Sequence, residues 1–410
     1  MNKFKYYIAI ICVCMLSARG AGTPGMNSES GQPKTEKVIS GETKDSVFDV
    51  GADYAVLIDF DTGEVLFQKK SDEIMAPSSS TKIMTTYLIF DMLEEKKFSL
   101  SDKFKVSIRA WRQDGTRMFL EPEWKVTVDD LIMGTLAISG NDAAIVLAEG
   151  SLGTIADFVE KMNEKAKILN LANTHFSNPN GLYEKTHYMS AHDLAILAQS
   201  LIKNHKKYYD KYFSQQSFTY NNITQKNRNL LLSEYGGVDG IKTGHTDQGK
   251  YMIVTSAVKN GKRLIAVVGH AQTDRSAMDD AKALLDYGFS QYVYLDLYKR
   301  GNIVKIIDTF LSKNNKVQVY ANRDIGYAIK KPNVSNIKVR LVHDKYIFKP
   351  IRIGEVVAQL VIEDGDIVSR YNLYAKNSTR ELSGFRKFVN LMKYNCRKLI
   401  SISFSKNETS

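Results

Sequence analysis

The sequence predicts an α+β fold, in which helices pack on an antiparallel sheet and a small all-β domain and a terminal amphipathic helix follow. Strand-like patterns stand at both ends of residues 47–292 and helical patterns lie between them, so the first and last strands should meet in space. After about residue 291, short apolar runs separated by turn residues predict the second domain, over residues 293–376. The 410 residues are comfortably enough for two domains.

The expected elements of residues 47–292 follow one another in a simple order. A hairpin is expected first, because apolar runs at 55–59 and 64–67 flank the turn Asp61-Thr62-Gly63. Helical periodicity dominates from about residue 79 to residue 207 and returns near the end of this domain. The clearest helices are 82–93, 128–149, 191–202 and 275–289, and the later strands are 240–242, 251–258 and 263–268. The second domain is expected to contain strands at 304–307, 317–320, 337–342, 356–361 and 367–374.

The N-terminus has the layout of a secretory signal peptide over residues 1–22. Lys3 and Lys5 precede an apolar run at 6–16, and small residues follow that run. The run is too short to anchor the chain across a bilayer, and residues 23–46 have the composition of a flexible leader. Two of the three cysteines lie in the signal, so the mature chain would keep Cys396 alone. This excludes an internal disulfide and disfavours thiol catalysis.

Residues 380–404 are expected to form an amphipathic helix that binds an anionic membrane surface. Its apolar stripe consists of Phe385, Phe388, Val389, Met392, Cys396, Leu399 and Ile400. Lysines and arginines cover much of the remaining surface, where anionic headgroups would meet them. A helix docked on the protein's own body is the alternative. The membrane hypothesis places the protein at the outer, periplasmic face of the cytoplasmic membrane.

The net charge of +11 does not require nucleic acid as a partner, because the basic helix accounts for part of it. The tyrosine- and lysine-rich segment 206–212 resembles a nucleic-acid patch by composition only, and a solvated helix end is the simpler interpretation.

Ser79 and Lys82 are the first candidate catalytic pair. On a helix, this spacing places a hydroxyl and an amine one turn apart on the same face. A serine becomes a nucleophile when a neighbour takes its proton, and a lysine whose pKa is lowered by burial and nearby cations can do so. The pattern is weak alone, because serine and lysine recur at this spacing elsewhere in the chain.

Two further motifs add to this pair. Ser139-Gly140-Asn141 separates two helical stretches, so a loop there could aim Ser139 to protonate a leaving amine and Asn141 to hold Lys82 and the substrate backbone. Lys242-Thr243-Gly244 lies in a strand pattern that begins at Val238. There Lys242 adds positive potential and Thr243 can bind a carboxylate, while Gly244 lets a peptide approach the strand edge.

In this order, the three motifs form the catalytic signature of penicillin-binding proteins and class A β-lactamases. The surrounding sequence resembles the low-molecular-mass D-alanyl-D-alanine carboxypeptidases. The similar segments are 75–85 (MAPSSSTKIMT), 138–144 (ISGNDAA), 174–182 (THFSNPNGL), 238–246 (VDGIKTGHT) and 284–289 (LLDYGF). The similarity runs from about residue 53 to residue 289, and more weakly through 350–375 and the terminal helix. The resemblance implies a penicillin-binding or β-lactamase-like fold for residues 47–292.

The resemblance also implies a reaction. Ser79 would attack the carbonyl between the two terminal D-alanines of a peptidoglycan pentapeptide stem, with Lys82 as general base, and water would then hydrolyse the acyl-enzyme. Removing this alanine would control cross-linking, and β-lactams would acylate the same serine. The oxyanion hole would consist of the backbone N–H groups of Ser79 and His245. Arg228 and Arg275 would lie near the terminal carboxylate, with a surface ion pair as the alternative for each.

No cofactor or metal is expected. His175, His187 and His192 are close in sequence, but they lack the spacing and the acidic partners of a metal site, so structural roles are expected for them.

Three other functions remain open at this point. A class A β-lactamase needs a Glu-Xaa-Xaa-Leu-Asn pattern, but Ala166 stands where the glutamate should precede Leu169-Asn170, so penicillin should form a slow acyl-enzyme. A DD-endopeptidase would cut cross-links, although such relatives usually lack a second domain. A catalytically silent muropeptide-binding scaffold would not need the nucleophile and base together, and fluorescent penicillin would not label it.

Overall fold

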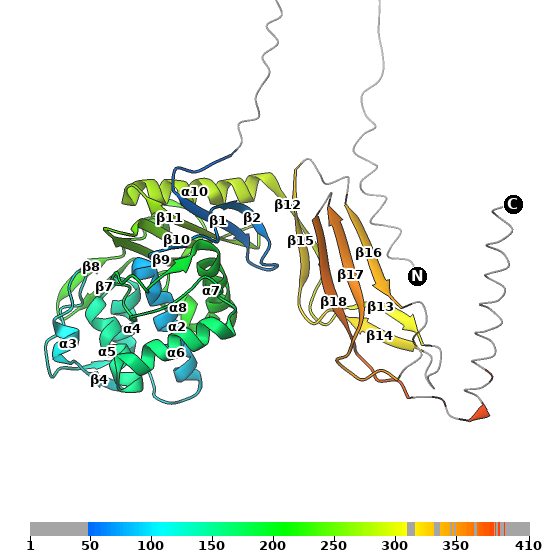
Figure 1. The fold of residues 1–410 in the computed structure, drawn as a ribbon, viewed down its shortest axis with the longest axis horizontal. Helices are drawn as coiled ribbons and strands as arrows, with labels where there is room; N and C mark the ends of the chain where they lie inside the picture. The colour runs from blue at the N-terminus through cyan, green and yellow to red at the C-terminus, as the bar shows by residue number, and fades with distance from the viewer. Residues whose placement is uncertain are drawn as a thin grey trace, which may run out of the picture. The chain divides into compact units, whose positions relative to one another are not determined.

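The protein is described from a computed structural model, which covers residues 48–309, 316–331, 337–344, 347, 350–364 and 367–380, with residues 382, 384, 385 and 389 (Figure 1). The expected signal peptide (1–22) and leader (23–46) lie outside the described residues, as does most of the expected helix at 380–404. Within the described residues, no helix has the length and apolarity needed to cross a membrane.

The first part of the described chain is built on a five-stranded antiparallel sheet in the order β2-β1-β11-β10-β9. The strands are β1 (Tyr54–Asp59), β2 (Val65–Lys69), β9 (Val238–Thr246), β10 (Lys250–Lys259) and β11 (Lys262–Ala271). The expected meeting of the first and last strands is confirmed, because β1 pairs with β11 and Val56 faces Val267. The central strands are buried almost continuously because helices cover both faces of the sheet.

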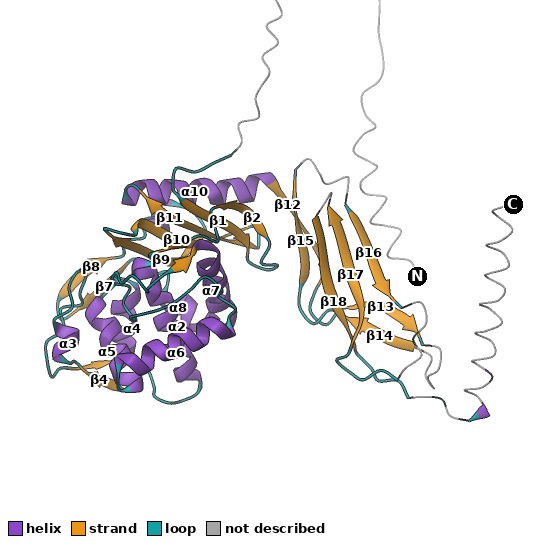
Figure 2. Cartoon of the chain, in the orientation of Figure 1, coloured by secondary structure: helices purple, strands orange, loops and turns teal. Residues whose placement is uncertain are grey.

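Helix α10 (Asp274–Gln291) covers one face of the sheet, and the helical cluster lies on the other (Figure 2). In that cluster, α7 (Ala191–Asn204) packs on β1 and β11, and α2 (Lys82–Glu94) packs in turn on α7. Helix α2 is buried around most of its circumference, so it is a core helix. The other helices are α3 (Ile108–Trp111), α4 (Val128–Leu136), α5 (Asn141–Leu152), α6 (Ile155–Ile168), α8 (Lys206–Tyr212) and α9 (Leu231–Glu234).

Two local features of the helical region bear on the site. Ser79 lies in a 3-10 turn, η2 (Ser78–Thr81), and the α-helix begins only at Lys82. The helical pattern expected over 128–149 is divided into α4 and α5 at the loop expected around Ser139, which adopts a positive φ of 66° that an α-helix cannot accommodate. Three short ribbons pair β3 (Ile74–Met75) with β6 (Met189–Ser190), β4 (Lys103–Lys105) with β5 (Lys125–Thr127), and β7 (Ser217–Tyr220) with β8 (Ile223–Lys226).

The second part of the chain is all β, as expected. A five-stranded sheet has the order β13-β14-β18-β17-β16, and β12 (Tyr292–Tyr298) pairs with β15 (Ile325–Lys330). The strands of the larger sheet are β13 (Ile303–Asp308), β14 (Lys316–Tyr320), β16 (Lys338–His343), β17 (Val356–Asp364) and β18 (Ile367–Ala375). All five correspond to expected strands. Strands β12 and β15 were not expected, and β15 contains Gly326 and Ala328, which have low strand propensity.

A partly buried ion pair holds the start of β9, the strand that carries Lys242. The Arg263 guanidinium on β11 donates to both carboxylate oxygens of Asp239, at 2.8 and 2.7 Å. The Tyr209 hydroxyl donates to the same carboxylate at 2.7 Å. The sheet and α8 are therefore joined at the base of the strand.

Replacing Asp239 with alanine is expected to lower the free energy of unfolding by about 2 kcal/mol, because Arg263 and Tyr209 lose their acceptor. Urea unfolding followed by circular dichroism measures this change. Asp210→Ala is the matched control, because it breaks an exposed pair with Lys206 that should contribute less than about 0.5 kcal/mol. Equal losses in the two variants would contradict the assignment.

Candidate active site

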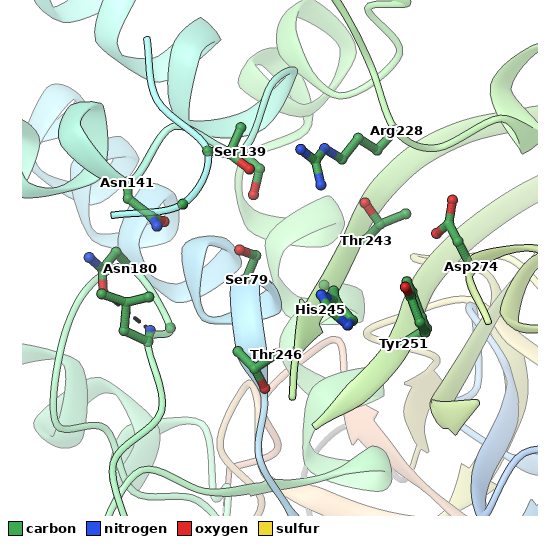
Figure 3. A pocket seen from close by; sticks show the side chains of 15 residues that line it. Ser79, Ser139, Asn141, Asn180, Arg228, Thr243, His245, Thr246, Tyr251 and Asp274 are labelled. Carbon is green, nitrogen blue, oxygen red and sulfur yellow. Dashed lines mark hydrogen bonds between the residues drawn. The ribbon is translucent and has the colours of Figure 1, made fainter. Parts of the chain in front are cut away.

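A cavity of about 450 Å³ lies beside β9, and residues of all three sequence motifs line it (Figure 3). Ser79 comes from η2, Ser139 and Asn141 from the junction of α4 and α5, and Thr243 from β9. The remaining lining residues are Gly115, Thr116, Asn180, Gly181, Leu182, Arg228, Gly244, His245, Thr246, Tyr251 and Asp274. Segments that are far apart in the sequence therefore meet at one cavity, with the Ser79 hydroxyl near its centre.

The Lys82 amine is buried directly behind Ser79. Its Nζ lies 3.0 Å from Ser79 Oγ, 2.7 Å from Asn141 Oδ1 and 2.5 Å from the backbone oxygen of Asn180. Asn141 Nδ2 donates to the Asp114 carbonyl at 2.7 Å, which fixes the orientation of the amide and turns Oδ1 toward Lys82. The amine thus has three oxygen neighbours, and the two amide oxygens can only accept.

These contacts define what a neutral amine can do. Its two N–H bonds are directed to the oxygens of Asn141 and Asn180, so its lone pair is left facing the Ser79 hydroxyl. Burial lowers the pKa of Lys82 well below its usual value; the positive charges of Lys242 and Arg228 lower it further, against an opposing effect of Asp142. The environment therefore favours the form of Lys82 that can accept a proton.

The turn between α4 and α5 forms the wall opposite β9. Ser139 has a positive φ, and its side chain is largely buried and lines the cavity. The Asp142 carboxylate, in the first turn of α5, accepts hydrogen bonds from the backbone N–H groups of Met118 and Leu120. These bonds hold the segment that supplies the Asp114 carbonyl, so Asn141 is itself held in place.

The strand β9 supplies the facing wall. Lys242 is buried, and burial lowers its pKa to about 7, with a further contribution from the Arg228 charge. Gly244 has a packing role besides the expected one, because a Cβ atom there would lie 2.9 Å from Met252 Cγ and 3.1 Å from Ser78 Cβ. His245 on β9 pairs with Tyr251 on β10, and their rings stack with centres 4.2 Å apart.

The two arginines are placed differently. Arg228 lines the cavity, whereas Arg275 does not. Thr273 caps α10, and Arg275, in the first turn of that helix, is exposed and pairs with Glu234 at 2.7 Å and Asp279 at 3.0 Å. The expectation that Arg275 lies near the substrate carboxylate is therefore corrected in favour of its alternative, a surface ion pair. Its neighbour Asp274 lines the cavity instead.

Sequence reasoning assigned no role to Asn180, although it lies within a segment that resembles the family. Its contact with Lys82 is made by a backbone carbonyl, and such a contact leaves no side-chain signal in a sequence. Asp274 and Tyr251 were also missed, because neither belongs to a catalytic motif.

The three histidines have different hydrogen-bond partners, although His175 and His187 lie in the same paired region. His192 Nδ1 lies 3.0 Å from Asp72, and His175 Nδ1 lies 2.6 Å from the Thr186 carbonyl. His187 is buried and contacts Thr81 and Ser177. In the part of the chain that the structure describes, no group of three or more histidine, cysteine, aspartate or glutamate side chains could hold a metal ion.

Comparison with protein families gives two matches. Residues 40–273 match the family described as D-alanyl-D-alanine carboxypeptidase, and residues 292–381 match the C-terminal domain of penicillin-binding protein 5.

Individual relatives extend this similarity. The chain is 38% identical over 343 residues to the D-alanyl-D-alanine carboxypeptidase DacF of Bacillus subtilis, an alignment that covers 82% of this chain and 87% of that protein. The crystal structure of penicillin binding protein 5 from Haemophilus influenzae has a TM-score of 0.78 and 33% identity, over 82% of this chain and 99% of that one. The crystal structure of ampicillin-bound penicillin-binding protein D2 from Listeria monocytogenes has a TM-score of 0.55 and 29% identity, over 60% of this chain and 99% of that one.

Proposed function

Because this chain belongs to the D-alanyl-D-alanine carboxypeptidase family, we propose that it is a serine hydrolase that removes the terminal D-alanine from peptidoglycan pentapeptide stems. The observation that carries the proposal is the environment of Lys82, whose amine has two fixed acceptors and the Ser79 hydroxyl as its third neighbour. A scaffold that merely binds muropeptides has no use for this arrangement.

The proposed reaction has two stages. Lys82 accepts the proton of Ser79 as Oγ attacks the carbonyl carbon between the two D-alanines, and the carbonyl oxygen becomes an oxyanion. The backbone N–H groups of Ser79 and His245 stabilise this charge, an interaction typically worth several kcal/mol. Lys82 passes this proton through Ser139 to the departing D-alanine nitrogen as the C–N bond breaks, which leaves an ester on Ser79 and a neutral Lys82. Water then attacks the ester carbonyl and gives one proton to Lys82, which returns it to the serine oxygen as the ester bond breaks.

Substrate binding is assigned to the β9 side of the cavity. Gly244 lets the stem peptide approach the strand edge and Thr243 hydrogen-bonds its carboxylate, while Lys242, buried on the same strand, adds positive potential. Arg228 binds the terminal carboxylate that distinguishes a carboxypeptidase substrate from an internal peptide bond.

Replacing Arg228 with glutamine is expected to raise KM for a D-Ala-D-Ala stem peptide about 30-fold, from the loss of about 2 kcal/mol of charged hydrogen bonding. The same peptide with a methylated terminal carboxylate should be affected little, because it has no charge to lose. Steady-state kinetics on both peptides make the comparison. Arg275→Gln is the matched control, since this exposed arginine lies outside the cavity. A larger effect of Arg275→Gln, or equal effects of Arg228→Gln on both peptides, would contradict the assignment.

The proposal includes slow release of β-lactams. Ala166, at the position where a class A β-lactamase pattern needs glutamate, is buried in α6 and does not line the cavity. With no carboxylate there to activate water, the penicilloyl ester on Ser79 should persist.

We also propose an extracytoplasmic location at a membrane surface. The support lies in the sequence: the basic and apolar start over residues 1–22, and the basic stripe and Phe-rich face over 380–404. The anionic surface of the cytoplasmic membrane is the partner that this charge pattern fits.

The direct test of function uses a pentapeptide stem that ends in two D-alanines and, separately, a cross-linked stem dimer. Mass measurement of the products should show loss of one alanine from the pentapeptide. An unchanged pentapeptide would refute the proposal, and cleavage of the dimer alone would make the protein an endopeptidase.

A further inference from the structure

His187 joins the turn that leads into Lys82 to the segment whose Asn180 carbonyl contacts the Lys82 amine. The side chain is buried and does not line the cavity. Its Nε2 lies 2.8 Å from the hydroxyl of Thr81, the residue that precedes Lys82. Its Nδ1 lies 3.1 Å from the backbone nitrogen of Ser177, at the start of the segment that leads to Asn180.

The two contacts fix the protonation state of the ring. A backbone N–H can only donate, so Nδ1 of His187 must accept from Ser177 and carries no hydrogen. The neutral ring then carries its hydrogen on Nε2, which donates to Thr81 Oγ1. Burial, together with smaller effects of the charges of His175 and Lys82, lowers the pKa of His187 to about 4. The ring is therefore neutral near pH 7, and both hydrogen bonds are intact.

The segment from Ser177 to Gly181 is attached to η2 and α2 at several points. Thr85 Oγ1 donates to the Pro179 carbonyl at 2.5 Å, and Lys82 Nζ donates to the Asn180 carbonyl at 2.5 Å. Gly181 has a φ of +84°, and a Cβ there would lie 1.8 Å from the Ser78 carbonyl oxygen. His187 provides the attachment at the start of the segment, and it does so through the residue beside Lys82.

We infer that His187 is a positioning residue that holds the Asn180 carbonyl against Lys82, so that the amine keeps its lone pair on the Ser79 hydroxyl. The inference rests on the proposed hydrolase function. Without the imidazole, Ser177 and Thr81 separate, the Asn180 carbonyl moves, and the N–H bonds of Lys82 are no longer confined to two acceptors. Because no atom of His187 lines the cavity, the loss falls on proton transfer and leaves ligand binding nearly unchanged.

The test measures acylation of the full chain by a fluorescent penicillin in stopped flow, which separates the dissociation constant from the acylation rate constant. His187→Phe keeps an aromatic ring and removes both hydrogen bonds. It should lower the rate constant about a hundredfold and change the dissociation constant less than about threefold. His187→Gln carries an amide that can donate to Thr81 and accept from Ser177, so it should recover most of the rate.

A second buried histidine provides the matched control. His205 Nδ1 lies 3.0 Å from Glu94, and His205 does not line the cavity. His205→Phe should lower stability and leave the acylation rate constant unchanged. If His187→Phe does not fold, His187→Asn, which keeps an acceptor near Ser177 and loses the reach to Thr81, takes its place.

The outcomes separate the inference from the proposed function. No acylation of the unmodified protein would overturn the hydrolase proposal itself. Normal acylation of the unmodified protein with an unchanged rate constant in His187→Phe would overturn the inference alone. The inference also fails if His187→Phe weakens penicillin binding as much as it lowers the acylation rate constant. It fails too if the rate constant of His187→Gln is as low as that of His187→Phe. In either case the histidine would have only a general structural role.

Discussion

Replacing Lys82 with methionine is expected to slow acylation of Ser79 by about 10³-fold while the fold persists. The variant has no group that can take the serine proton, and general bases typically contribute 10²- to 10⁴-fold to a rate. Methionine fills a space similar to that of the lysine stem and needs no desolvated amine, which offsets the loss of donors to Asn141 and Asn180. Fluorescent penicillin measures the rate, and thermal unfolding measures the stability.

The pH dependence sharpens this prediction. Acylation of the unmodified protein should rise with pH through the pKa of Lys82, which burial and the Lys242 and Arg228 charges hold below the usual lysine range. The slow residual reaction of Lys82→Met should lack this rise. Lys161→Met, at an exposed helix position, is the control and should react like the unmodified protein. A Lys82→Met rate within tenfold of the unmodified protein would remove lysine from the base role.

Replacing Ser79 with alanine is expected to abolish hydrolysis of the stem peptide, a loss of at least about 10⁴-fold, because no covalent intermediate can form. The neighbouring serines provide an unusually close control. Ser80 Oγ donates to the Pro77 carbonyl at 2.5 Å, and Ser78 Oγ lies 3.0 Å from Thr246 Oγ1. Both hydroxyls are therefore hydrogen-bonded to groups other than Lys82. Ser80→Ala should therefore retain activity to within about tenfold.

Each of the two variants is incubated with the stem peptide, and chromatography measures how much product forms. Activity that survives in Ser79→Ala, or disappears equally in Ser80→Ala, would mean that the nucleophile has been assigned to the wrong serine of the run.

The sequence could predict the sheet because its signal is strong and local at both ends of the first domain. Apolar, strand-like runs stand before and after a long helical region. Few sheets can be built from such runs unless the first and last strands pair, as β1 and β11 do. Strands β12 and β15 escaped prediction for different reasons. The first follows α10 without a break, and the second depends on its partner more than on its own composition.

The site shows a similar division. Ser79, Lys82, Ser139, Asn141 and Lys242 could be named from their spacing and order, because these side chains form a signature. The Asn180 carbonyl and the two-sided contact of His187 could not, since the first is a backbone atom and the second depends on a loop's path. Arg275 pairs with Glu234 and Asp279 at the surface, and the sequence does not show which way the first turn of α10 faces.

The central claim is that Lys82 activates the hydroxyl of Ser79, and no other, for covalent attack. The most direct test treats the unmodified protein with benzylpenicillin and locates the adduct by intact-protein mass and peptide mapping. A single penicilloyl group on Ser79, formed with a rate that rises with pH, is the predicted result. No adduct, or an adduct on Ser78, Ser80 or another residue, would contradict the account.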